Sequence, residues 1–74
     1  MTDADKKNAK RTVKELMFHA LKDHHYDVLK TIVWATNYYG VRHDSAQGIA
    51  LRKISRDDMN EIIEEMCEQN VTKQ

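Results

Sequence analysis

The chain has 74 residues, 41% of them hydrophobic and 32% charged, and its 12 Lys and Arg residues balance 12 Asp and Glu residues. This length allows one domain with a thin core, over residues 1–74, and the single cysteine excludes an internal disulfide. The zero net charge excludes the overall basic excess that DNA-binding domains use against phosphate.

The N-terminal segment is polar and charged, and no apolar segment follows it. We therefore expect neither a signal peptide nor a membrane anchor. A lone cysteine is typical of a reducing compartment, which predicts a cytoplasmic protein. We expect both ends of the domain, residues 1–8 and 71–74, to fray.

The first predicted helix begins between Asp3 and Ala9 and ends near Lys22. Its apolar residues recur at helical spacing and form one stripe, which comprises Ala9, Val13, Leu16, Met17, Ala20 and Leu21.

Asp23 is a suitable N-cap for a second helix from His24 to Tyr39. The break between the first and second helices is very short, which predicts either an antiparallel hairpin or one long bent helix. Gly40 is expected to end the helix in the left-handed cap conformation. The face predicted to point inward consists of Val28, Leu29, Ile32, Val33, Thr36 and Tyr39.

The segment 41–54 is the least patterned part of the chain. A short helix after Ser45 is one interpretation, although Gly48 weakens it by about 1 kcal/mol relative to alanine. A loop with a single helical turn is the other.

A last helix is predicted after Ser55, which caps it, and Asp58 is expected to reach back to the Ser55 amide. Its buried stripe comprises Met59, Ile62, Ile63, Met66 and Val71. Together these elements predict an all-α fold, a small compact bundle of three to four helices.

Histidines and acids gather around the first break and in the central segment. Their spacing permits a zinc or nickel site or a pH sensor, but it matches no established ligand pattern. Exposed turn residues are the simpler interpretation, and we predict no metal and no cofactor. The residues in question are His19, Asp23, His24, His25, Asp27, His43 and Asp44.

Nothing in the sequence indicates catalysis. Cys67 lies among glutamates, whose negative charge disfavours the thiolate that a nucleophile needs. The chain has no glycine-rich phosphate loop and no nucleophile elbow. We therefore predict that the protein is not an enzyme.

A helix-turn-helix over residues 35–53 is one functional hypothesis, because Ala35, Gly40, Val41 and Ile49 lie near the positions that this motif requires. Gly48 inside the recognition helix and Asp44 at its start argue against it. The side chains then available for phosphates or bases would be Arg42, His43, Gln47, Arg52 and Lys53.

An aromatic face on the side of the second helix opposite its predicted inward face favours protein binding. Trp34 and Tyr38 lie four residues apart, opposite the predicted inward face of their helix, and Phe18 lies beside the stripe of the first helix. A helix that is apolar on both sides is normally sandwiched between partners. The second layer would be either the 41–54 segment, which makes Trp34 an ordinary core residue, or another subunit.

Charge is divided along the chain. Residues 1–22 carry six basic and three acidic residues (+3), and residues 55–74 carry two basic and six acidic ones (−4). Glu61, Glu64, Glu65 and Glu68 include same-sign pairs at four-residue spacing, which destabilise an isolated helix. We expect them to face a basic surface, either on the first helix or on a partner.

These observations predict a small protein-binding regulator or inhibitor, as a homodimer, without membrane association. A helix-turn-helix transcriptional regulator that binds DNA is the alternative.

Overall fold

In the computed structural model, residues 3–42 and 44–73 are described, with side chains for residues 7–42 and 44–69. Four helices occupy this part of the chain: α1 (Asp3–Asp23), α2 (Val28–Gly40), α3 (Ala46–Lys53) and α4 (Arg56–Lys73). No strand occurs within it, so the predicted all-α bundle is confirmed. Of the described helices, none is long and apolar enough to cross a lipid bilayer.

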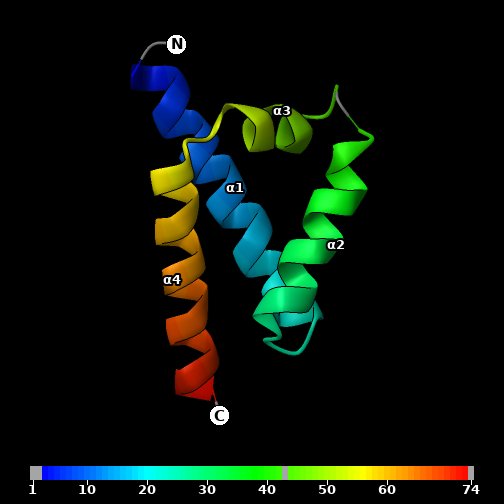
Figure 1. Ribbon diagram of the computed structural model, residues 1–74, viewed down its shortest axis with the longest axis vertical. Coiled ribbons are helices and arrows are strands. Elements are labelled where there is room, and N and C mark those ends of the chain that lie inside the picture. The colour runs from blue at the N-terminus through cyan, green and yellow to red at the C-terminus, as the bar shows by residue number, and fades with distance from the viewer. Residues whose placement is uncertain (1–2, 43, 74) are drawn as a thin grey trace.

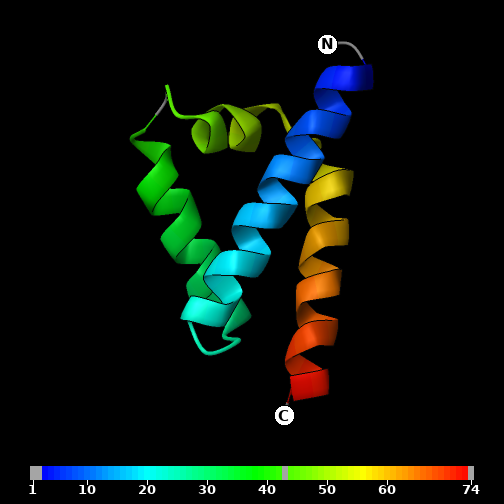
Figure 2. The ribbon, with the colours of Figure 1, turned by 180° about the vertical axis from the view of Figure 1, so that it is seen from behind.

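Helix α1 is the centre of the fold, and the other three helices all contact it. Helices α1 and α4 lie side by side and run in the same direction, while α2 returns antiparallel to α1 (Figures 1 and 2). Helix α3 crosses the end where α2 leans away from α4 (Figure 1). The molecule measures 38 × 24 × 15 Å, which makes it a flat body with two broad faces.

The core lies along α1, as its apolar stripe predicted. Val13, Met17 and Leu21 are fully buried on α1, against Ile62 and Met66 of α4. Ala35 and Ala50 bring α2 and α3 to the same cluster. The predicted stripes of α1 and α4 are therefore confirmed over their central turns, and the side chain of Val71 lies outside the described residues.

The turn between α1 and α2 differs from the prediction. Asp23 is the last residue of α1, and Asp27 caps α2 by accepting a hydrogen bond from the Lys30 amide at 3.0 Å. His25 and Tyr26 adopt left-handed conformations, with φ of 56° and 63°. These two residues reverse the chain within four positions, which produces the hairpin and moves the start of α2 to Val28.

Helix α2 is rotated relative to the prediction. Thr31 and Ala35 are fully buried, whereas Leu29 is 71% and Val33 48% exposed. The small side chains of Thr31 and Ala35 allow a close approach to the rest of the core, and the Thr31 hydroxyl donates to the Asp27 carbonyl at 2.8 Å. The predicted inward face was therefore wrong for Leu29, Val33 and Thr36.

Helix α2 ends at Gly40, as predicted, but by another route. No described glycine has a positive φ, and Val41 forms the C-cap in a right-handed conformation. Arg42 supplies a further cap, because its Nη1 donates to the Tyr38 carbonyl at 2.8 Å.

The short helix after Ser45 is confirmed as α3. Ser45 caps it by accepting from the Gly48 amide at 2.9 Å. Gly48 is buried, and a Cβ there would overlap the carbonyl oxygen of Arg42. This glycine therefore permits a close approach between α3 and the preceding loop.

Ser55 caps α4 as predicted, because the Asp58 amide donates to the Ser55 hydroxyl at 3.1 Å. The expected return bond from the Asp58 carboxylate to the Ser55 amide stays a prediction. The predicted fraying of residues 1–8 and 71–74 stays a prediction. The helices include residues 3–8 and 71–73, and residues 1, 2 and 74 lie outside the described part.

Candidate functional site

Ion pairs join α1 to α4 along their shared edge. The Lys10 amine lies 2.8 Å from Glu61 and 3.9 Å from Asp58, and Lys14 lies 3.1 Å from Glu65. The hydrogen bond from Lys10 lowers the pKa of Glu61, and the same bond raises the pKa of Lys10. Two of the four predicted interface glutamates thus face α1 within the monomer.

Of the other two glutamates of that group, Glu64 is exposed on α4, and Glu68 is exposed but lines a hollow with Lys14 and Phe18 of α1. Their predicted role toward a partner protein stays a prediction.

The aromatic residues of α2 stack in a row. The Trp34 ring lies 5.4 Å from the ring of His24 and 5.2 Å from that of Tyr38, and the Arg42 guanidinium lies 3.6 Å from the Tyr38 ring centre. Trp34 is half-buried against the core. Trp34 and half-exposed Tyr38 therefore pack against each other and their neighbours, and their predicted role in binding a partner stays a prediction.

Phe18, the third predicted binding aromatic, is half-buried against the core cluster, with the Lys14 amine 5.9 Å from its ring centre.

The segment 35–53 lacks several contacts that a helix-turn-helix needs. Ala35 is buried as required, but Val41 is 73% and Ile49 41% exposed, where the motif packs both residues inside. Arg42 is held against Tyr38.

The remaining predicted nucleic-acid residues are dispersed. Lys53, Gln47 and Arg52 line three different hollows of the surface. His43 lies outside the described residues.

The histidines do not gather into a site within the described part of the chain. There, no three His, Cys, Asp or Glu side chains lie close enough to hold a metal ion. His24 makes a local contact instead, with its Nδ1 2.7 Å from the Ala20 carbonyl. The predicted absence of a metal site stays a prediction, because His43 is not described.

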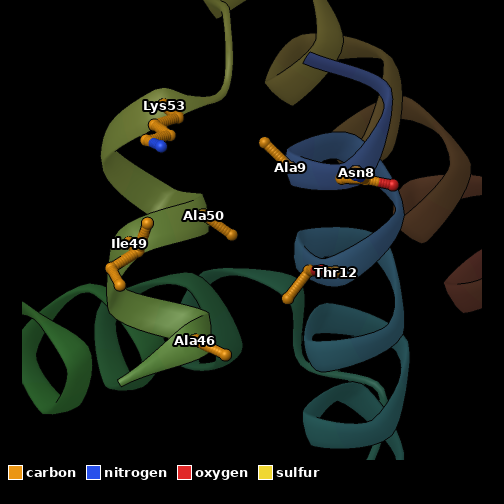
Figure 3. A pocket seen from close by; sticks show the side chains of 7 residues that line it. All are labelled: Asn8, Ala9, Thr12, Ala46, Ile49, Ala50 and Lys53. Atoms are coloured by element: carbon orange, nitrogen blue, oxygen red, sulfur yellow. The ribbon is translucent and has the colours of Figure 1, made fainter. Parts of the chain in front are cut away.

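A hollow of about 280 Å³ lies between α1 and α3 (Figure 3). Small side chains form it: Ala9 and Thr12 point from α1 toward Ala46 and Ala50 of α3 (Figure 3). Lys53 is the one ionisable side chain among its lining residues. This lining offers no acid and base pair, and the expectation that the protein is not an enzyme stays a prediction.

A mostly apolar surface, whose stripes on the two helices carry no charge, extends over α2 and α4. On α2, Leu29, Val33 and Thr36 follow one another at spacings of four and three residues and so share one side of the helix. Thr36 and Gly40 line a hollow of about 230 Å³ whose opposite side is Met59 of α4.

On α4 the apolar surface continues through three residues at four-residue spacing, which are Met59, half-buried Ile63 and exposed Cys67. Leu51, Arg52 and Ile54 line the hollow at the α3 end. We call this surface the α2–α4 face, and it consists of Leu29, Val33, Thr36, Met59, Ile63, Cys67 and the hollow between the two helices.

Sequence reasoning missed this face because it assigned Leu29 and Val33 to the core. One signal was available, since α2 carries a single charged residue, Lys30, among 13. No protein-family model, curated protein or solved structure matches the chain.

Proposed function

We propose that this protein is a small binding module that docks a protein partner through the α2–α4 face and acts as a regulator or inhibitor. The observation that carries the proposal is the exposure of Leu29, at 71%, and of Val33, at 48%, on a helix with one charged residue. Charge depletion at the centre of a patch is typical of protein–protein interfaces.

The polar groups near the face support its apolar character. The Thr36 hydroxyl donates back to the Ile32 carbonyl at 2.9 Å. Its hydrogen bond is therefore already made, so burial of this residue leaves no unpaired donor. On α4, Glu61 and Glu65 are engaged with α1, away from the side that carries Met59 and Ile63.

A matched pair of variants tests the proposal. Leu29→Gln places a polar group in the face, and Val41→Gln makes the same kind of change at an equally exposed aliphatic residue outside it. We expect the immobilised wild-type protein and the Val41 variant to retain the same binding partner from a host lysate. The Leu29 variant should lose it, and equal retention by both variants would contradict the proposal.

DNA binding by the 35–53 segment is the competing function, and a titration with duplex DNA separates the two. We expect no binding at about 150 mM salt, where non-specific phosphate contacts are largely lost. Sequence-specific binding that persists there, and that Arg52→Ala weakens, would replace the proposal.

A further inference from the structure

The α2–α4 face points to a second copy of this chain as its occupant. We infer that two molecules pair through this face about a two-fold axis, with their α2 helices antiparallel. The inference rests on the proposed function, because it names a partner for the same face.

Charge makes the face suitable for its own copy. In a two-fold interface the same patch meets itself, so a charged patch would bring like charges together. The apolar stripes of the face carry no charge, and Arg52 is the one charged residue among those that line the hollow. The outer side of α4, where Glu64 is exposed, is unsuited to the same arrangement.

The order of side chains along α2 also fits an antiparallel pair. An axis that passes through Val33 sets Val33 against its equivalent and sets Leu29 against Thr36 of the other copy. A large residue then lies opposite a small one, which is how facing helices interdigitate. Lys30, in the first turn, comes toward the C-terminal end of the other α2, where the helix dipole favours a cation.

The face lies on a broad side of the molecule. Helices α2 and α4 lie in front of α1 on the broad side of the molecule, which measures 38 by 24 Å (Figure 1). A stable dimer takes about 800 Å² from each partner. The outline of this broad side is larger than that of the sides that are 15 Å deep.

The stability of so small a chain adds to the case. A core of this size supplies only about 3–5 kcal/mol, and small domains often add a partner chain. Leu29 and Val33 are the large side chains of α2 that the monomer leaves most exposed on this side. A second copy would remove them from water.

Sedimentation equilibrium of the full chain tests the inference. We expect the wild type to show twice the 8.7 kDa mass of the chain at high micromolar concentration. Leu29→Gln should weaken the dimer about a hundredfold, because the burial of a leucine is lost twice in a symmetric pair. Val41→Gln should leave the dissociation constant unchanged. Circular dichroism of both variants verifies that they fold.

A cross-link tests the axis itself. On the inferred axis, Val33→Cys in a Cys67→Ser background sets one thiol against the other, and a disulfide forms if their Cβ atoms come within about 4 Å. We expect mild oxidation to give a covalent dimer from this variant and none from Val41→Cys in the same background.

Three results would overturn the inference: a wild-type monomer at high micromolar concentration, a dimer that Leu29→Gln leaves intact, or a dimer that Val41→Cys cross-links instead. If the wild type is monomeric and Leu29→Gln still abolishes partner capture, the inference fails and the proposed function stands. If Leu29→Gln affects neither self-association nor capture, both fail.

Discussion

Replacing the two glycines with alanine, one at a time, is expected to change stability in opposite directions. Gly40 is an exposed helical residue, and a Cβ built there meets no atom within 4 Å. Alanine is favoured over glycine in a helix by about 0.5–1 kcal/mol. Because Gly40 is the last residue of α2, we expect Gly40→Ala to stabilise the protein by about 0.5 kcal/mol.

At Gly48 the gain in helix propensity is smaller than the cost of the steric overlap that alanine introduces. A Cβ would overlap the Arg42 carbonyl oxygen and lie 2.9 Å from the Ser45 hydroxyl. Overpacking of this kind costs about 1–3 kcal/mol. A shift of the loop would also weaken the hydrogen bonds that Ser45 donates to Arg42, at 2.8 and 3.2 Å, each contributing about 1 kcal/mol. After the helical gain, we expect Gly48→Ala to destabilise by about 2 kcal/mol.

Thermal unfolding followed by circular dichroism measures both effects. A change of 1 kcal/mol moves the Tm of a domain this small by about 4–8 °C. We therefore expect the Tm to rise by a few degrees in Gly40→Ala and to fall by roughly 10 °C in Gly48→Ala. All samples need equal concentration, because self-association makes Tm depend on it. A rise in Tm for Gly48→Ala equal to that for Gly40→Ala would refute the reasoning.

Three further changes test the core, the α1–α4 edge and the cap of α2. Ile62→Ala should lose about 2–5 kcal/mol in denaturant titration, because Ile62 is fully buried; Ile62→Val should lose about 1 kcal/mol. Glu61→Gln should lower stability at neutral pH, and the deficit should shrink as pH falls: because the pKa of Glu61 is lowered, its contribution is complete above the ordinary carboxyl pKa and is lost as pH falls through the lowered pKa. A deficit that persists in acid, or an equal deficit in Glu64→Gln, would contradict this assignment. Arg42→Ala should cost about 1 kcal/mol through its bond to the Tyr38 carbonyl, and a Tm equal to that of the wild type would argue against that cap.

The helices that the sequence described well are those with one apolar side. Helices α1 and α4 each have one apolar side and one charged side. The spacing of Val13, Met17, Ile62 and Met66 was therefore sufficient to identify the core. The ion pairs across their edge follow the predicted division of charge, since facing α1 was one of the two alternatives considered for the acidic side of α4.

Helix α2 shows why the remaining part of the fold, and the candidate site on it, could not be predicted. Its apolar residues surround the helix, so hydrophobicity did not determine which side turns inward. The choice depends on how closely Thr31 and Ala35 allow it to approach the core. The α2–α4 face depends on the same rotation, and it was therefore not visible in the sequence.

Local signals were ambiguous in two other places. Asp23 and Asp27 are equally good capping residues, and nothing in the sequence marks His25 and Tyr26 as left-handed. Gly48 suggests a weakened helix until its tertiary neighbour, the Arg42 carbonyl, is known.

The stacked aromatic rings on α2 make the fluorescence of Trp34 a probe of the α1–α2 hairpin. Trp34 is the only tryptophan, and its ring contacts are with His24 in the turn and with Tyr38 and Tyr39 on α2. Its fluorescence is therefore sensitive to separation of the turn from α2, whereas loss of α4 would register mainly as lost helicity. Emission and ellipticity recorded during one unfolding experiment would show whether the α1–α2 hairpin and the C-terminal helix come apart together or in sequence.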